Sequence, residues 1–508
     1  MGKNIVRTSV WVTLILCIGY AVSFLKESVI ANYFGVSADV DAYTIAIQIP
    51  VILFSFVAVA LRSIVVPIYT DIKQNQGEEH SKEYINVLIG VLGFLTLLLV
   101  VVVFIFSKYV IMIFAPGFTP ETNHIASNLL RILCPTILTT LLANVFISVL
   151  NVHDKFILPS IAVLFLNTTI IFSILFLHSR WGIVSAAVGQ LFGCILEVGF
   201  LSILLRDVLR LKPKINWKNP YVRQSFKMAL PVIWSTSIAE LNAMINRVVA
   251  SFLFVGSIAV LSYAAKINSV FISLFTSAIA TIIYPLYADS TARHDMKGLS
   301  LRINKTLSAY SLFLIPLTCL ILCLKQEIIA IAFERGAFNA DAVDRTQVLL
   351  GWYSLGLIFM GFRESLTKVF YSLKDTKTPA INATIGFIIN IALNLTLPFI
   401  IGVQGLAIST SITAVIISIG LMVRLLKKHK EIELGILKSN IFRIIPPSFL
   451  STALCLIALY FTPSGDKYIL ASVGLLTFMT VYLSSLSIFR PTVWFEIIRN
   501  FTKTHRTQ

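Results

Sequence analysis

Long apolar stretches alternate with short polar connections from one end of the chain to the other. About 20 consecutive apolar residues are enough for a helix to cross a bilayer. This pattern predicts fourteen membrane-spanning helices, at 8–33, 41–69, 84–107, 123–150, 156–178, 182–205, 224–254, 257–287, 303–325, 345–372, 378–400, 403–427, 441–462 and 467–489. No stretch is long and polar enough for a separate soluble domain. The predicted fold is therefore an all-α polytopic membrane protein.

Short motifs recur in the same order, about 218 to 223 residues apart. PIYTD at 67–71 returns as PLYAD at 285–289, and FAPGF at 114–118 returns as FERGAF at 333–338. The other pairs are Tyr43 with Tyr263, Asp154 with Asp375, Pro159 with Pro379, Asn167 with Asn390, and Gly182 with Gly405. This ordered series predicts two duplicated six-helix halves, 1–215 and 216–430. Two further helices and a cytoplasmic tail follow at 431–508.

Six predicted helices separate the two copies, so both copies run in the same direction through the membrane. Such parallel repeats, related by an axis along the membrane normal, belong to transporters with a site between the halves. The two proline motifs predict the cytoplasmic end of the second helix in each half, where a proline ends or bends the helix at low cost. We expect these motifs to be structural rather than to contact substrate.

Composition and charge agree with a membrane protein. The 508 residues are 57% hydrophobic and 13% charged, and the mean hydropathy is +0.87, whereas a soluble domain is about a quarter charged. The net charge of +17 sits largely in short connections such as 206–227 and 427–438. It therefore predicts that both termini are cytoplasmic, and not that the protein binds nucleic acid. The N-terminal apolar stretch shows no cleavage site, so we expect no cleavable signal peptide.

Ionisable side chains within the predicted helices form the candidate substrate site, because charge at membrane depth is costly and usually faces a cavity or a partner. The first, second, seventh and eighth helices hold equivalent places in the two halves. They carry Lys26, Arg62, Arg247 and Lys266 with the acids Glu27 and Glu240. Lys26 and Glu27 are expected to point in different directions. Of the candidates, Glu240 is secondary, as are Arg363 and Glu364. The cationic balance predicts an anionic substrate such as a phosphate or pyrophosphate.

Sequence signatures of common enzymes are absent. The chain has no P-loop, no HExxH, no GxSxG and no histidine cluster. The six cysteines lie in apolar segments and have neither metal-ligand spacing nor the pattern of a disulfide framework. We therefore expect no catalysis, no direct use of ATP, no cofactor and no metal.

A resemblance to the MurJ (MviN) lipid II flippases of the MOP exporter superfamily covers roughly residues 10–425. It rests on ANYFGVSADVDAYTIAIQIP at 31–50, VVPIY at 65–69, FAPGF at 114–118, INRVVASFLFVGSIAVLSYAAKI at 245–267, IAFERGAFNADAV at 331–343 and FYSLKDTKTP at 370–379. The resemblance implies alternating-access transport of lipid II, an undecaprenyl-pyrophosphate-linked peptidoglycan precursor, to the outer leaflet of a bacterial cytoplasmic membrane. It also implies a lipid-linked anionic glycan as substrate, contact with membrane lipids, and cell-wall synthases as partners.

The resemblance implies roles for four residues of this chain. Lys26 matches a basic position on the first helix and Glu27 the acid beside it. Asp41 matches an acid before the second helix, and Lys266 matches a basic position on the eighth. Asp41 thereby joins Lys26, Glu27 and Lys266 among the predicted substrate-binding residues.

The chain also departs from the family pattern. Tyr20 stands where the family has an arginine, VILFSF at 51–56 replaces an arginine pair, and both matched basic residues are lysines. Arg62 is a candidate to compensate. These departures leave open a flippase for another lipid-linked oligosaccharide, such as a capsule or exopolysaccharide unit. A cation-coupled multidrug exporter, whose cavity should be rich in carboxylates, and a non-transporting scaffold fit the buried charges less well.

Overall fold

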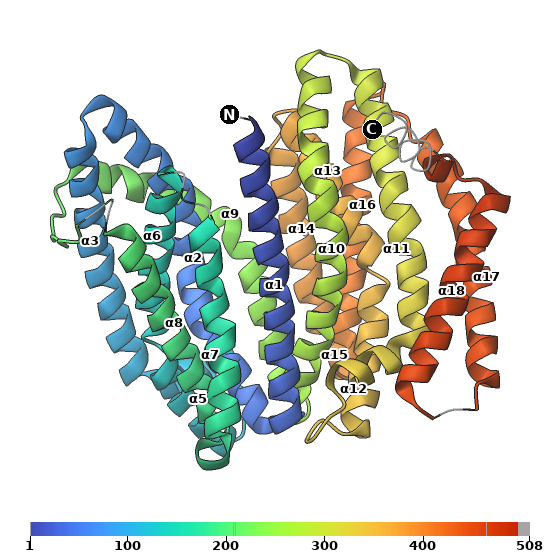
Figure 1. Ribbon diagram of the computed structural model, residues 1–508, viewed down its shortest axis with the longest axis horizontal. Helices are drawn as coiled ribbons and strands as arrows, with labels where there is room; N and C mark the ends of the chain where they lie inside the picture. Colours follow the sequence, from blue (N-terminus) through green and yellow to red (C-terminus); the bar gives the residue numbers. More distant parts are fainter. Residues whose placement is uncertain are drawn as a thin grey trace. The chain divides into compact units, whose positions relative to one another are not determined.

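The computed structural model describes residues 2–153, 155, 157–206, 208, 210–463 and 465–495. Side chains are described within these ranges except at 2–10, 12–13, 16, 55–63, 163, 229–239 and 274–282. The described chain contains eighteen α-helices and no strand (Figure 1), which confirms the predicted all-α fold. Contacts divide it into two compact units, Met1–Ala259 with Arg335–Phe338 and Val260–Glu334 with Asn339–Gln508.

The first unit is a bundle of nine helices. They are α1 (Gly2–Phe34), α2 (Ala38–Asn75), α3 (Glu78–Ile105), α4 (Ser107–Phe114), α5 (Pro120–Leu133), α6 (Thr136–Val152), α7 (Ile157–Trp181), α8 (Val184–Leu205) and α9 (Pro220–Ser251). Helix α2 is central, because α5, α6 and α9 all pack along it. Buried side chains such as Tyr69, Tyr84 and Phe146 fill the core of this unit.

The second unit is a bundle around α11. Its helices are α10 (Ser257–Ala292, of which the first three residues belong to the first unit), α11 (Met296–Phe333), α12 (Ala340–Ser354), α13 (Leu357–Ser372), α14 (Lys377–Asn394), α15 (Leu397–Ile401), α16 (Gln404–Lys428), α17 (Gly435–Phe461) and α18 (Lys467–Phe489). Helices α12, α13, α17 and α18 all contact α11. The last two helices, drawn in red in Figure 1, also pack against each other.

Nine helical stretches among the described residues are long and apolar enough to cross a membrane. They are Glu78–Ile105, Pro120–Val152, Ile157–Trp181, Val184–Leu205, Met296–Phe333, Lys377–Ile401, Gln404–Lys428, Gly435–Phe461 and Lys467–Phe489. Large apolar side chains such as Phe94, Leu98 and Phe176 stay exposed along them, as expected for a surface that faces lipid. Each of the fourteen predicted spans coincides with one helix or with two consecutive helices separated by two residues. The chain is a multi-pass membrane protein, and the number of crossings stays a prediction.

The two proline motifs lie inside helices rather than at their ends. Helix α2 runs past Pro67 to Asn75, and α10 runs past Pro285 to Ala292. The prediction that each motif marks the end of its helix is therefore wrong. A proline removes one backbone hydrogen bond, and a helix in a packed membrane bundle tolerates that loss because its neighbours satisfy the freed group.

The tyrosine of each proline motif anchors its helix to a neighbour. Tyr69 and Tyr287 are both fully buried. The Tyr69 hydroxyl lies 3.1 Å from Nε2 of His153 at the end of α6, and the Tyr287 hydroxyl lies 3.0 Å from Oγ of Ser365 on α13. A buried hydroxyl needs such a partner to offset its desolvation. This shared role fits the expectation that the motifs are structural.

The glycine turns correct one pair of the repeat. Gly182 connects α7 to α8 with φ of 51°, and Gly402 connects α15 to α16 with φ of 74°. Both positions need the left-handed backbone that glycine adopts without strain. Gly405, the predicted counterpart of Gly182, instead lies inside α16, where a Cβ would stand 2.6 Å from the Leu397 carbonyl carbon. The true counterpart is Gly402, and the offset stays near 220.

Candidate functional site

Lys26 and Glu27 form an ion pair near the end of α1. Nζ of Lys26 lies 3.0 Å from Oε1 of Glu27, and the two side chains are 12% and 23% exposed. The expectation that these neighbours point apart is wrong, because the long lysine stem lets its ammonium group turn back toward the carboxylate. An ammonium group this well shielded needs an anionic partner. The pair therefore stabilises the lysine charge within the bundle.

Asp41, in the first turn of α2, holds the beginning of α10. Its Oδ2 accepts a hydrogen bond of 2.7 Å from the Gly256 N–H, and its Oδ1 accepts one of 2.7 Å from the Ala259 N–H. The side chain is almost completely buried. A carboxylate at this position satisfies unpaired N–H groups at a helix N-terminus and interacts favourably with the helix dipole. Both oxygens of Asp41 are thus engaged by backbone.

The connection 335–338 packs against the end of α1. Nη1 of Arg335 donates to Oγ of Ser28 at 3.1 Å, and the Ala337 N–H donates to the Asn32 carbonyl at 2.8 Å. Gly336 has φ of 51°, and a Cβ there would overlap the Asn32 carbonyl oxygen. Glycine is therefore required by both conformation and space.

The sequence predicted FERGAF to be part of the repeat and of the family resemblance, but it did not single out Arg335. The signal was present, because this arginine lies in a connection on the side that is otherwise poor in lysine and arginine. An exception to the charge bias of membrane loops is a reason to look for a specific partner.

Four connections of the first unit meet at one end of its bundle. We call them the loop cluster: 34–37, 115–118, 251–256 and 335–338. The Gly117 N–H donates to Oγ of Ser251 at 3.1 Å, and a Cβ on Gly117 would overlap the Ser251 carbonyl. Backbone therefore lies directly against backbone in this cluster, near the lower end of α1 in Figure 1.

The two predicted site residues on α9, Glu240 and Arg247, are partly buried. Nη1 of Arg247 donates to the Ala243 carbonyl one turn earlier, at 3.2 Å. Glu240 lies two turns before Arg247 on the same helix. The side chain of Arg62, the predicted cation of α2, lies outside the described residues.

The remaining predicted charges belong to the second unit. Lys266 lies on α10 and is partly buried. On α13, Oε1 of Glu364 lies 3.3 Å from Nζ of Lys368, and Arg363 is exposed. The predicted residues are thus divided, with Lys26, Glu27, Asp41, Glu240 and Arg247 in the first unit and Lys266, Arg363 and Glu364 in the second.

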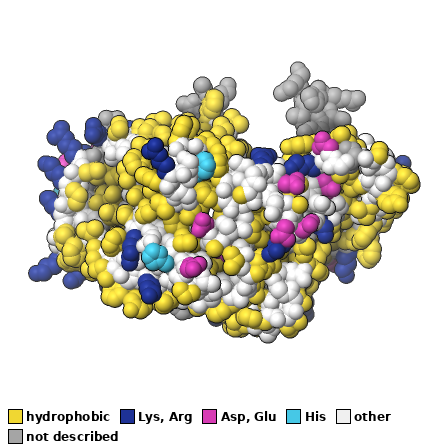
Figure 2. All heavy atoms as spheres, turned by 90° about the horizontal axis from the view of Figure 1, so that it is seen from below, with side chains coloured by type: hydrophobic (Ala, Val, Ile, Leu, Met, Phe, Trp, Pro, Cys, Tyr) yellow, Lys and Arg dark blue, Asp and Glu magenta, His cyan; other side chains and the backbone are white. Residues whose placement is uncertain are grey.

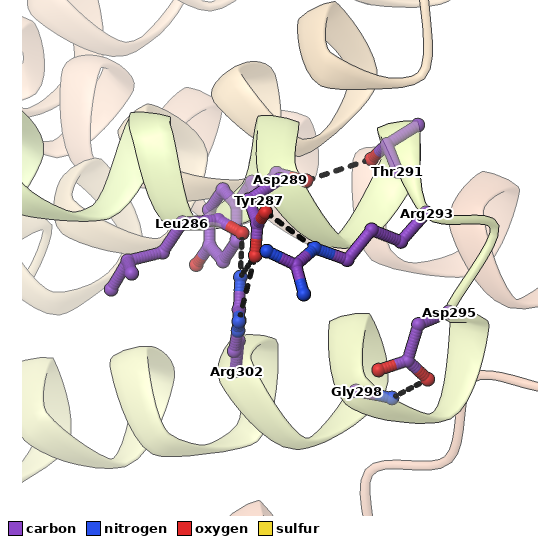
Figure 3. Close-up of polar contacts among 8 residues, drawn as sticks. All are labelled: Leu286, Tyr287, Asp289, Thr291, Arg293, Asp295, Gly298 and Arg302. Atoms are coloured by element: carbon purple, nitrogen blue, oxygen red, sulfur yellow. Dashed lines mark hydrogen bonds and ion pairs between the residues drawn. The ribbon is translucent and has the colours of Figure 1, made fainter.

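Asp289, the last residue of PLYAD, links α10 to α11. Figure 3 shows its carboxylate between two arginines, with Nε of Arg293 at 2.7 Å and Nη2 of Arg302 at 3.2 Å. Arg302 also donates to the Leu286 carbonyl. The hydrogen bond from Arg293, together with Arg302, holds the pKa of the Asp289 carboxyl below its usual range. The corresponding acid of PIYTD, Asp71, instead accepts from Asn75 at 2.7 Å.

A sequence profile of the family described as lipid II flippase MurJ matches residues 30–476. The chain belongs to the MurJ family. Among its relatives, the lipid II flippase MurJ of Thermosipho africanus is 29% identical over 477 residues, which are 94% of each chain. The probable lipid II flippase MurJ of Buchnera aphidicola from Acyrthosiphon pisum is 28% identical over 421 residues, covering 81% of this chain and 82% of the relative.

Solved structures agree with membership of the MurJ family. A lipid II flippase MurJ in an inward closed conformation has a TM-score of 0.81 at 27% identity, covering 94% of this chain and 98% of that one. An inward-facing MATE multidrug transporter of the MOP superfamily has a TM-score of 0.65 at 14% identity, covering 81% and 94%. At that identity the likeness shows the fold alone. The family named from the sequence is thereby confirmed, whereas the roles of single residues stay predictions.

Proposed function

We propose that this MurJ-family protein transports lipid II across the bacterial cytoplasmic membrane, from the inner to the outer leaflet. The observation that carries the proposal is the family match over residues 30–476. The head group of lipid II is too polar to cross hydrocarbon unaided, because it would lose its hydration there. The family match favours lipid II over the other lipid-linked oligosaccharides that the sequence left open. Likeness to a drug exporter extends only to the fold.

We infer that the pyrophosphate of the substrate binds Lys26 and Lys266, with Arg62 and Arg247 adding positive charge. The pair that Lys26 forms with Glu27 supports this assignment, since a shielded ammonium group needs an anion whether or not substrate is present. A pyrophosphate that displaces the carboxylate keeps the lysine paired. Glu240, Arg363 and Glu364 are secondary candidates.

We infer that Asp41 acts in gating rather than in binding substrate. Both of its oxygens are engaged by backbone, through the Gly256 and Ala259 N–H groups, and an acid supplies no positive charge for a pyrophosphate. The charge bias of the connections puts both chain termini in the cytoplasm, which places the loop cluster on the outer side. In an alternating-access cycle, the contacts of Asp41 and of Arg335 would hold that side closed. They would have to open for release.

Growth rescue tests the proposed substrate. The resident lipid II flippase of a bacterial host is depleted, and this chain is expressed in its place. We expect growth to be restored, because the host then again exports its cell-wall precursor. Normal amounts of the protein in the membrane without rescue would count against lipid II and in favour of another lipid-linked glycan. An association with cell-wall synthases stays a prediction, and purification from the rescued cells would test it.

A further inference from the structure

A polar cavity of about 680 Å³ lies at the cytoplasmic end of the first unit under the proposed orientation. It is lined by residues of α3, the end of α8 and the connection that follows: Glu79, His80, Lys82, Glu83, Asn86, Arg206, Val208, Arg210, Lys212 and Lys214. Five of these side chains are cationic and two are carboxylates. None of them belongs to the substrate or gating residues described above.

Among the described residues, four of the five cations have no carboxylate partner. Lys82 is balanced by Glu78 at 3.2 Å and by Glu79 at 3.3 Å. Arg206, Arg210, Lys212 and Lys214 form no ion pair with any carboxylate in the described part of the chain. Five cations against two carboxylates leave the lining with an excess of positive charge. Like charges repel one another, and a bound anion relieves that repulsion.

The backbone that carries these cations is fixed to α3. Oδ1 of Asn86 accepts a hydrogen bond of 2.7 Å from the Lys212 N–H. The backbone carbonyl of Asn86 accepts one of 3.1 Å from the Lys214 N–H. Its Nδ2 donates to the Arg210 carbonyl at 3.3 Å. Gly90 allows this approach, because a Cβ there would overlap the Lys214 carbonyl. The charge bias of membrane loops requires only that lysine and arginine be present. It does not require that their backbone be held in one conformation around a cavity.

The surroundings of the cavity favour a lipid over a soluble anion. The same connection exposes Leu211, Ile215 and Trp217, and exposed tryptophan with basic neighbours is typical of the interface between membrane and water. Both adjoining helices are apolar enough to span the membrane, and α3 begins and α8 ends at this cavity. Figure 2 shows lysine and arginine side chains gathered at the edge where Figure 1 places this connection.

We propose that this cavity binds the phosphate head group of an anionic glycerophospholipid from the cytoplasmic leaflet. The arginines and lysines contact the phosphate, while Leu211, Ile215 and Trp217 lie among the acyl chains beside it. Basic pockets at the cytoplasmic ends of membrane helices recognise such head groups. The site is separate from the proposed path of lipid II and gives the first unit a fixed contact with the membrane surface.

Fluorescence quenching in lipid vesicles tests the proposal. Full-length protein is reconstituted with brominated phosphatidylglycerol or brominated phosphatidylcholine at equal fractions, and the signal of Trp217 is taken as the difference between wild type and Trp217→Phe. We expect stronger quenching by the anionic lipid. The Arg210→Gln/Lys212→Gln/Lys214→Gln variant should bind it at least about tenfold more weakly, since each basic residue near the surface contributes about 1 kcal/mol. These changes leave the backbone contacts of Asn86 in place.

A matched control variant distinguishes binding at this cavity from a general effect of the protein's net charge. Lys427→Gln/Lys430→Gln/Lys438→Gln removes the same charge from exposed positions of the second unit and should leave the quenching unchanged. Equal loss in both triple variants, or equal quenching by the two lipids in wild type, would overturn the proposal. If added inorganic pyrophosphate abolished the preference for the anionic lipid in wild type, the cavity would be a site for soluble anions instead. The comparison of the two lipids in wild type tests the proposal even if a variant fails to fold.

Discussion

At the scale of single residues, the buried charges of this protein are held by partners that differ in kind. Lys26 is held by a neighbouring carboxylate, whereas Asp41 is held by two backbone N–H groups. The first arrangement can exchange one anion for another. The second joins the beginning of α2 to the beginning of α10 through backbone groups. We therefore expect substitutions at these residues to fail in different ways.

Asp41→Asn should weaken the closure at the loop cluster. The amide has only one acceptor oxygen, and its NH₂ group would face a backbone N–H, so we expect a loss of about 1–2 kcal/mol of stability and reduced growth rescue. Thermal unfolding in detergent and the rescue assay measure both effects. Asp39→Asn, in the same turn of α2, is the matched control and should behave as wild type. Equal behaviour of the two variants would contradict the gating role.

Lys26→Ala and Lys266→Ala should each lower transport by about ten- to a hundredfold, the loss expected when a hydrogen bond to a charged group disappears. Growth rescue at matched protein levels is the measurement, and Lys438→Ala, an exposed lysine, is the control. The double variant Lys26→Ala/Glu27→Ala discriminates further. If the pair were only structural, removing both charges would restore transport. We expect no restoration.

At the scale of elements, the long apolar stretches were enough to place the helices but not their ends. The chain continues as helix through Pro67 and Pro285, because the packed neighbours that tolerate a proline are not visible in the local sequence. The repeat of PIYTD and PLYAD did indicate a shared structural role, and the buried tyrosines supply it. Their partners, His153 and Ser365, lie 84 and 78 residues away. Sequence distance of that size hides the contact.

Tyr287→Phe should destabilise the second unit by about 1 kcal/mol, since it removes a buried hydrogen bond and leaves the Ser365 hydroxyl without that partner. Thermal unfolding of the purified protein measures the change. Tyr284→Phe lies three residues earlier on α10 at an exposed position and should have no effect. Equal destabilisation by the two variants would show that the hydrogen bond between Tyr287 and Ser365 is not the cause.

Asp375, between α13 and α14, predicts a pH dependence. Burial alone would raise the pKa of its carboxyl, but hydrogen bonds from Lys428 and Thr378 outweigh burial and hold the pKa well below the usual range. A depressed pKa means that the stabilisation is present at neutral pH and is lost as pH falls through the folded-state pKa. At pH 7 the free energy of unfolding of wild type should exceed that of Asp375→Asn by about 1 kcal/mol.

Thermal unfolding from pH 8 to pH 3 checks this dependence. The gap between wild type and Asp375→Asn should stay constant down to about pH 5 and shrink below it, as the unfolded carboxyl takes up its proton. A gap that widens in acid would contradict the role of Lys428 and Thr378.

At the scale of the whole molecule, local sequence patterns predicted the fold and the family. The boundaries of the two compact units depend instead on tertiary contacts. The predicted halves divide at 215/216, a statement about the repeat that stays a prediction. The compact units instead keep α9 with the first unit, because α9 packs along α2. Residue roles were harder for the same reason. The local sequence around Asp41 does not show its contacts with Gly256 and Ala259, which lie more than two hundred residues away. Its role in binding substrate stays a prediction.

The central claim is that this protein moves lipid II to the outer leaflet, and the most direct test measures that movement. In cells depleted of the resident flippase and expressing this chain, the fraction of lipid II that reacts with an external, membrane-impermeant head-group reagent is determined. The account predicts that wild type restores this fraction to the level of undepleted cells, and that Lys26→Ala/Lys266→Ala does not. If the fraction stays at the depleted level while the wild-type protein is present in the membrane, the account is contradicted.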